Sequence, residues 1–192
     1  MNKFSQSKLI VFSAMFFTLF YNFSFFKNIL NTYSFEGLNI VYVSSIIILL
    51  ISFLLLLFTL FSSKYTTKPL LIIVLIISSF TAYFMDTYHV VIDDSMIRNS
   101  MQTNLAESSD LFSLKLVIYV FLLGLLPSYI IYKTKINYKS FKNEVFSKVK
   151  TIILSLIVIL IIVFSFSKFY TSFFREHKPL RYHVNPIYWI YS

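Results

Sequence analysis

The feature that most constrains the fold is an apolar run from Ile152 to Phe164, in which Ser155 is the only polar residue. A helix that is apolar on every side has no face for water. The Ile, Leu, Val and Phe residues between Ile152 and Phe166 contribute at most about −4 to −8 kcal/mol to insertion at a bilayer centre. No charged residue lies in this stretch to oppose insertion. We therefore expect the segment to span a membrane.

Four more segments have the same character, and hydrophobic residues make up 57% of the chain against 13% charged residues. Each is long enough to cross about 30 Å of hydrocarbon as a helix. A secretory signal peptide is the alternative for the first segment, but it is long for one and no small-residue cleavage site follows it. The five predicted spans are Leu9–Phe26, Leu38–Phe61, Pro69–Met85, Phe112–Tyr132 and Thr151–Tyr170.

The expected fold is thus an all-α, polytopic membrane domain of five helices over residues 1–172, with a periplasmic loop at 86–111. Residues 173–192 form a periplasmic juxtamembrane segment. Pro69 suits the first turn of its helix. Pro127 should kink the fourth span, and Gly124 one turn earlier should allow close helix packing.

Charge predicts the orientation of these spans. With the N-terminus in the cytoplasm, the inside segments carry ten lysines and one glutamate, and the outside carries seven basic and seven acidic residues. The positive-inside rule favours this arrangement, which puts the C-terminus in the periplasm of a bacterial inner membrane. The basic stretch Lys133–Lys150 is then a topological anchor. A site for anionic lipid or nucleic acid is the weaker alternative, and we expect no nucleic-acid partner.

The spans offer little chemistry. No Asp, Glu, Lys, Arg or His lies within 9–26, 38–61, 69–84 or 151–166, which disfavours an ion-coupled transporter. Two glycines cannot build a phosphate-binding loop, and the absence of cysteine excludes disulfides and thiolate zinc sites. We find no nucleophile–base pair and no metal-ligand spacing, so no catalytic or metal residue is predicted in this chain.

A helix from about Ser95 to Asp110 is predicted to lie on the membrane surface with its apolar side down. At 100° per residue, Asn99, Thr103 and Glu107 share one face. Periodicity alone favours a solvated face. The alternative is a patch for a lipid headgroup, and a carboxylate with two neutral hydrogen-bonding groups suits an amine-bearing headgroup.

The second exterior cluster is the stretch Arg175-Glu176-His177-Lys178-Pro179-Leu180-Arg181, followed by Asn185-Pro186. Its basic residues favour contact with lipid phosphates, and Lys178 and Arg181 are the candidates for that role.

Two exterior motifs carry a family resemblance. They run from Tyr83-Phe84-Met85-Asp86-Thr87-Tyr88 through Asn99, Thr103 and Glu107, and from Phe173 to Pro186. The chain resembles, over essentially its whole length, the membrane domain of bacterial phosphoethanolamine transferases. These enzymes modify lipid A or other envelope glycans and include the mobile colistin-resistance enzymes. His89 departs from the pattern, since glycine is expected there.

The resemblance implies that phosphatidylethanolamine donates its headgroup to a threonine in a zinc-bearing, sulfatase-like domain, from which it passes to lipid A or a similar acceptor. It also implies that Asn99, Thr103 and Glu107 contribute to the lipid-substrate site. The threonine and the zinc ligands are expected beyond Ser192, so this chain is predicted to need no cofactor and to be inactive alone.

Two hypotheses remain open. In the first, the chain is a fragment or split gene product that anchors the catalytic domain and helps to bind the donor lipid. In the second, it is a non-catalytic truncated membrane protein, either a remnant or a lipid-binding partner subunit.

Overall fold

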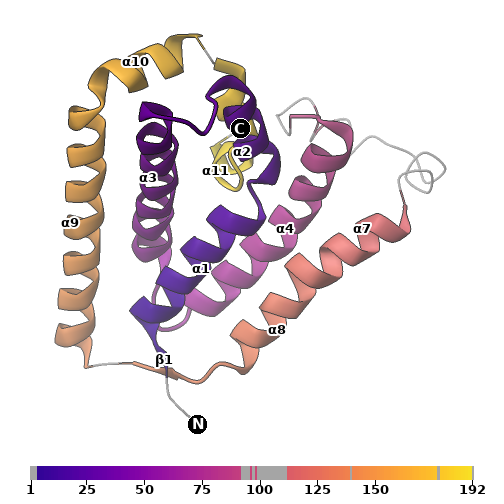
Figure 1. Ribbon diagram of the computed structural model, residues 1–192. Helices are drawn as coiled ribbons and strands as arrows, with labels where there is room; N and C mark the ends of the chain where they lie inside the picture. The colour runs from indigo at the N-terminus through magenta and orange to yellow at the C-terminus, as the bar shows by residue number, and fades with distance from the viewer. Residues whose placement is uncertain are drawn as a thin grey trace.

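The computed structural model describes residues 4–91, 96, 98, 112–138, 140–176 and 178–191. Long helices run side by side between two ends of a bundle, and the two chain termini lie at opposite ends (Figure 1). We name these the N-terminal end and the C-terminal end. Four described helices are long and apolar enough to cross a membrane, and a bent pair at the start of the chain gives a fifth if it counts as one span. The predicted class, a polytopic α-helical membrane protein, is confirmed.

The described elements follow each other from strand β1 to helix α11. In chain order they are β1 (Phe4–Ser5), α1 (Gln6–Phe20), α2 (Phe23–Thr32), α3 (Leu38–Phe61), α4 (Thr67–Tyr88), α7 (Leu114–Tyr119), the π-helix η1 (Val120–Leu125), α8 (Leu126–Lys133), β2 (Ile136–Asn137), α9 (Phe141–Ser165), α10 (Ser167–Glu176), the 3-10 helix η2 (Lys178–His183) and α11 (Ile187–Tyr191).

The first span differs from the prediction. The segment expected to be one helix over Leu9–Phe26 is two helices, α1 and α2, which meet at an angle of 56°. The side-chain amide of Asn22 donates a hydrogen bond to the Phe17 carbonyl at 3.0 Å. An asparagine that bonds its own backbone in this way competes with regular helix. The break therefore falls at Tyr21 and Asn22, between the two helices.

The fourth span keeps its continuity despite Pro127. α7, η1 and α8 form one span, and the distortion takes the form of the π-helical turn directly before the proline. Proline has no N–H to donate to the carbonyl of the fourth residue before it, here Leu123. The hydroxyl of Tyr21 donates a hydrogen bond to this carbonyl instead. The proline thus leaves the Leu123 carbonyl without a donor from its own helix, and Tyr21, at the break in the first span, supplies one.

Gly124 brings η1 close to α4, as the sequence predicted. A Cβ atom at this position would lie 2.7 Å from Ser79 Oγ and 3.3 Å from Ser79 Cβ. The Ser79 hydroxyl is itself held in place, since it donates a hydrogen bond to the Ile76 carbonyl at 2.7 Å. Only glycine fits without displacing α4 or the serine.

At the N-terminal end, the start of the chain pairs with the connection between the fourth and fifth spans. Phe4 lies opposite Ile136 and Ser5 opposite Asn137 in a short parallel ladder. The N-terminus and the basic stretch after α8 therefore lie at the same end of the bundle, as the predicted topology requires. Which side of the membrane this end faces stays a prediction.

Part of the basic stretch predicted as a loop is helical, because α9 begins at Phe141. Two lysines at this end bind the carbonyls of other helix ends. Lys148 donates to the Ser62 carbonyl just after α3, and Lys68 donates to the Tyr132 carbonyl near the end of α8 at 2.7 Å. A cation is favourable at a helix C-terminus, where carbonyls lack partners. These lysines therefore stabilise the fold, and their effect on orientation stays a prediction.

The fifth span also differs from its predicted limits. It was expected to end near Tyr170, but α9 ends at Ser165 and α10 continues as a separate helix across the C-terminal end (Figure 1). Tyr170 lies within 2.8 Å of Ser45 Oγ through its hydroxyl, and the ring of Phe169 stacks on Tyr42 at 4.4 Å. α10 therefore packs on α3. The predicted domain boundary after residue 172 falls within α10 and stays a prediction.

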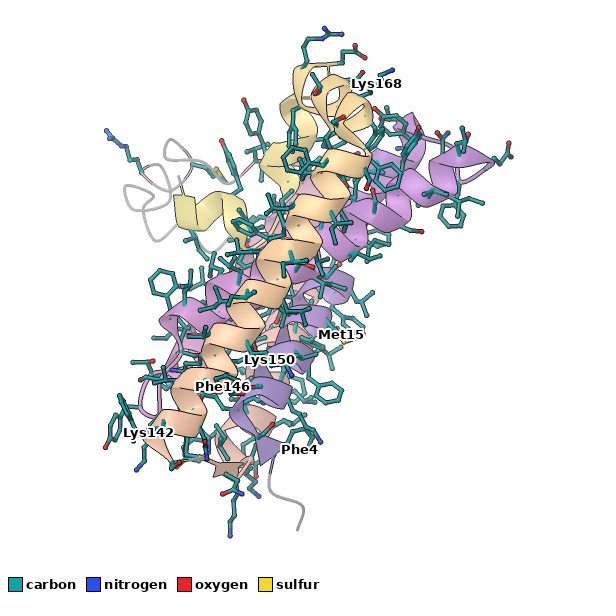
Figure 2. All side chains as sticks on the ribbon, turned by 90° about the vertical axis from the view of Figure 1, so that its left-hand side faces the viewer. Phe4, Met15, Lys142, Phe146, Lys150 and Lys168 are labelled. Carbon is teal, nitrogen blue, oxygen red and sulfur yellow. The ribbon has the colours of Figure 1, made fainter. Side chains whose placement is uncertain are left out.

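The long surface of α9 faces lipid. Among its residues only Ser155 and Ile162 are buried. Figure 2 shows Lys142 and Lys168 at opposite ends of this helix and its continuation, with Phe146 between them. Charged side chains thus mark the two ends of the apolar surface.

We predict that Gly124→Ala lowers stability by about 1–3 kcal/mol, because the added methyl group overpacks the contact with Ser79. Denaturant unfolding in detergent micelles measures this change. In the double variant Gly124→Ala with Ser79→Ala, the nearest remaining side-chain atom lies 3.3 Å away, so most of the loss should be recovered. An additive double variant would contradict the contact as the cause.

Candidate functional site

The described residues that flank the predicted site residues lie at the C-terminal end of the bundle. Asn99, Thr103 and Glu107 lie outside the described residues, as does most of the predicted helix that carries them; Met96 and Arg98 are helical. The backbones of Lys178 and Arg181 belong to η2, and their side chains lie outside the described part of the structure. The described residues show how the flanking segments are held.

A buried pair of asparagines joins the break in the first span to the end of the chain. The side-chain amide of Asn22 donates to the Asn185 carbonyl at 2.8 Å, and the Asn185 backbone N–H donates to Asn22 Oδ1 at 2.9 Å. Each residue is 1% exposed. Buried polar groups are costly unless they are paired, and this reciprocal pair satisfies both partners. We call it the Asn22–Asn185 pair.

The side chain of Asn185 extends the pair to α4. Its amide donates to the Ser78 carbonyl at 3.1 Å and to Thr81 Oγ1 at 2.8 Å. The following peptide bond, to Pro186, is cis. One residue thus binds both the α1–α2 break and the third span. The segment between η2 and α11 is therefore fixed to the bundle rather than merely tethered to the fifth span.

Asp86, near the end of α4, holds the beginning of α2. The backbone N–H of Ser24 donates to Asp86 Oδ1 at 3.1 Å, and the Tyr119 hydroxyl lies 3.5 Å from Oδ2. Ser24 is the second residue of α2, whose first-turn N–H groups have no partner within the helix. A carboxylate is favourable there because of the helix dipole. Lys115 places its ammonium 5.9 Å from the centre of the Tyr119 ring.

A second contact joins α4 to the start of α7. The hydroxyls of Tyr83 and Ser113 lie 2.7 Å apart, and Ser113 accepts a hydrogen bond from the Leu116 N–H as the N-cap of α7. The rings of Tyr83 and Tyr119 meet edge to face at 5.7 Å. Segment 92–111 lies between α4 and α7 in the chain. These contacts therefore hold the start of α7 against the final turns of α4.

Two histidines lie at the same end. His89 ends α4 in the left-handed conformation, with φ of 55°, which explains why glycine suits this position. His183 is half-buried at the end of η2, and its Nδ1 atom has no hydrogen-bond partner within the described structure. Burial lowers the pKa of His183 below its usual range, and the nearby His89 lowers it further.

The polar groups that organise this end were only partly visible in the sequence. Asn185 and Asp86 belong to the motifs noted there, but Asn22 was hidden in an apolar run. The sign of Asn22 in the sequence is a side-chain amide in the middle of an apolar segment. Hydrophobic segments seldom contain such a group without a partner. Within the described ranges, no group of three or more His, Asp or Glu side chains could hold a metal ion. No metal ligand is assigned to these residues.

The sequence profile of the phosphoethanolamine transferase EptA/EptB family matches residues 50–192. Among curated relatives, the chain is 43% identical to phosphatidylethanolamine transferase Mcr-2 of Escherichia coli over 112 residues, which are 58% of the chain and 21% of that protein. It is 30% identical to phosphoethanolamine transferase EptA of Salmonella typhimurium over 105 residues, which are 54% of the chain and 19% of that protein.

A solved structure matches almost the entire chain. It is the integral membrane protein lipooligosaccharide phosphoethanolamine transferase A (EptA) from Neisseria meningitidis, with a TM-score of 0.92 and 25% sequence identity. The match covers 98% of this chain and 35% of that one. The alignments with the curated relatives span about a fifth of their length.

We predict that Asn22→Ala lowers the free energy of unfolding by about 1–3 kcal/mol, because it leaves the buried Asn185 N–H without its acceptor. Chemical unfolding in detergent measures the change. Asn31→Ala is the matched control, since Asn31 is exposed on α2 and its change should be close to neutral. Equal effects of the two variants would contradict the role of the pair.

Stability should also fall as the pH falls below about 6.5, the unperturbed pKa of histidine. Because the folded-state pKa of His183 is lowered, the unfolded chain binds more protons than the folded chain in this range. Thermal unfolding between pH 7.5 and pH 5 measures the decline, and His183→Gln should make it shallower. A profile that His183→Gln leaves unchanged would refute the assignment.

Proposed function

The chain belongs to the phosphoethanolamine transferase EptA/EptB family and forms its membrane domain, and from this premise we propose that it anchors the enzyme and binds the donor phosphatidylethanolamine. The headgroup then passes to lipid A or a similar envelope glycan. The similarity to Mcr-2 supports this proposal, since Mcr-2 is a phosphatidylethanolamine transferase. The inner membrane, with the N-terminus in the cytoplasm and the C-terminus in the periplasm, is the location that fits this activity.

The proposed headgroup site uses two kinds of contact. Glu107 pairs with the ammonium group of the ethanolamine, and Asn99 and Thr103 supply neutral hydrogen bonds. Lys178 and Arg181 bind the phosphate, for which arginine offers paired donors. Charge of both signs is required because the headgroup is zwitterionic. In this proposal the chain's own residues bind and orient the donor, and they do not form or break its bonds.

The observation that most supports the proposal is the way the C-terminal end is held together. The Tyr83–Ser113 contact joins α4 to the start of α7, and Asp86 ties the end of α4 to α2. The Asn22–Asn185 pair fixes the chain just after η2 to α4 and to the α1–α2 break. The described residues that flank the two segments with the proposed contacts therefore belong to one hydrogen-bonded frame. A binding site assembled from two segments needs such a frame for precise geometry.

We predict that Glu107→Gln, in a full-length transferase that has this chain as its membrane domain, reduces headgroup transfer by about tenfold or more. The loss of one charge-assisted contact to the ammonium, worth about 1.5–3 kcal/mol, gives this magnitude. Transfer from fluorescent phosphatidylethanolamine to lipid A measures it, with KM for the donor rising more than kcat falls. Thr103→Ala should have a smaller effect in the same direction.

Glu36→Ala is the matched control, because Glu36 is an exposed carboxylate in the connection between α2 and α3. It should leave transfer unchanged. Membrane insertion is followed by fractionation for every variant. If Glu107→Gln inserts into the membrane and keeps full activity, this face of the predicted helix has no role in donor binding.

A further inference from the structure

A polar cleft lies at the N-terminal end of the bundle, near β1 (Figure 1) and at the opposite end from the proposed donor site. It consists of an inner chamber of about 20 Å³ and an outer chamber of about 470 Å³. Tyr138, Glu144 and Lys148 line both chambers, so the two adjoin each other. β1, α1, α3 and β2 complete the inner chamber, and residues 63–65 with the start of α9 complete the outer one.

Hydrogen bonds between distant segments hold the walls of the inner chamber. The side-chain amide of Gln6 donates to Thr67 Oγ1 at 2.6 Å, which ties α1 to the start of α4. The hydroxyls of Ser7 and Ser147 lie 3.2 Å apart and join α1 to α9. The chamber is therefore formed by the fold itself. A preformed site binds its ligand without first ordering its walls.

Two polar groups that line the chamber lack a partner among the described residues. Thr59 is 3% exposed, and its Oγ1 atom has no hydrogen-bond partner there. The half-buried carboxylate of Glu144 forms no ion pair in the described structure. The ammonium of Lys148, one turn later on α9, donates to the Ser62 carbonyl instead. Buried acceptors without donors are costly, so a ligand that donates to both is favoured.

The carboxylate of Glu144 acts on the cleft rather than on distant solvent. Burial raises the pKa of the Tyr138 hydroxyl above its usual value, and the negative charge of Glu144 raises it further. Tyr138 lines both chambers, as Glu144 does. The cleft therefore contains a negative charge close to its inner chamber.

The size of the inner chamber limits what can donate to these groups. A volume of about 20 Å³ holds one group of the size of a water molecule. A primary ammonium has this size, donates hydrogen bonds in several directions and neutralises a carboxylate. A water molecule would leave Glu144 without a counter-charge. A quaternary ammonium has no N–H to donate, and its methyl groups exceed the space.

The outer chamber suits a phosphate attached to that ammonium. Lys64 and Lys148 line it, and the Lys64 ammonium lies 5.7 Å from the centre of the Tyr65 ring, also in the lining. Lys148 keeps donors beyond the one that binds Ser62. Glu144 and Lys148 are four residues apart on α9, so their Cβ atoms are about 5–6 Å apart. A short spacer between ammonium and phosphate spans such a distance.

The position of the cleft in the bundle identifies the source of such a ligand. α3 and α9 are candidate membrane spans, and the cleft lies where α3 ends and α9 begins. Basic side chains at a membrane surface attract lipid phosphates. Phe141 and Val145 line the outer chamber, are exposed, and continue into the apolar surface of α9. A lipid in the bilayer can therefore place its headgroup in the cleft and its acyl chains along α9.

We propose that this cleft binds the headgroup of a glycerophospholipid that carries a primary ammonium, from the leaflet at the N-terminal end. The ammonium enters the inner chamber and donates to Glu144 and Thr59. The phosphate lies in the outer chamber beside Lys64 and Lys148. The site is separate from the donor contacts proposed at the C-terminal end, and it does not depend on headgroup transfer.

Headgroup selectivity provides the first test. The chain is reconstituted in nanodiscs of equal parts phosphatidylethanolamine, phosphatidylcholine and phosphatidylglycerol, and native mass spectrometry counts the lipids that it retains. Phosphatidylethanolamine should be retained about tenfold more than either of the others. Equal retention of the three lipids would overturn the proposal. A preference for phosphatidylglycerol would also overturn it, because the cleft would then bind an anion without using Glu144.

Variants locate the retained lipid and separate this site from the proposed donor site. Glu144→Gln should reduce retention of phosphatidylethanolamine by about tenfold, and Thr59→Val, which keeps the shape of the side chain, by severalfold. Glu36→Gln is the matched control, since Glu36 is an exposed carboxylate outside the cleft. The loss caused by Glu144→Gln should persist in a Glu107→Gln background, where the proposed donor site is already weakened.

Unchanged retention in Glu144→Gln would refute the site, and it is the result expected if water alone fills the inner chamber. If Thr59→Val does not fold, Glu144→Gln decides, because its half-buried side chain keeps its shape and makes no contact on which the fold depends. Loss of retention in Glu107→Gln but not in Glu144→Gln would assign the lipid to the donor site alone and would also refute the proposal.

Discussion

A membrane interior offers no water to backbone polar groups, so every interruption of a spanning helix must be satisfied by the protein itself. Here the interruptions determine which segments pack together. At the break, Asn22 is hydrogen-bonded to Asn185 from the far end of the chain. Asp86 accepts a hydrogen bond from the first turn of α2. The carbonyl that Pro127 leaves without a donor accepts its hydrogen bond from Tyr21, at the same break. Three distant segments therefore converge on one point in the first span.

This convergence makes the C-terminal end behave as a unit. α2, the end of α4, the start of α7 and the segment after η2 are joined by hydrogen bonds between residues that lie far apart in sequence. At the opposite end, lysines bind helix carbonyls and the N-terminal strand pairs with β2. The middle of the bundle has few such constraints, and α9 in particular is mostly exposed to lipid. Hydrogen bonds between distant segments are therefore concentrated at the two ends of the bundle, one of which is the end where donor binding is proposed.

The sequence predicted the spans well because hydropathy averages over about 20 residues, and the apolar limits of α3 and α4 are sharp. The same averaging hid the break at Asn22, since a single amide barely changes the mean of its window. It also extended the fifth span into α10, whose aromatic residues are as apolar as those of α9 although they pack on α3. The pairing of Asn22 with Asn185 could not be predicted, because the partners are 163 residues apart. Of the candidate site, the motif residues stay predictions from periodicity, charge and resemblance, whereas the contacts that hold the flanking segments required coordinates.

The position of Asn185 links the segment after η2 to this frame. Its backbone binds Asn22, and its side chain binds Ser78 and Thr81 of α4. Displacement of this segment would leave the buried Oδ1 atom of Asn22 without its donor, at the cost of an unpaired polar group. The segment after η2 is thus coupled to the packing of the first and third spans.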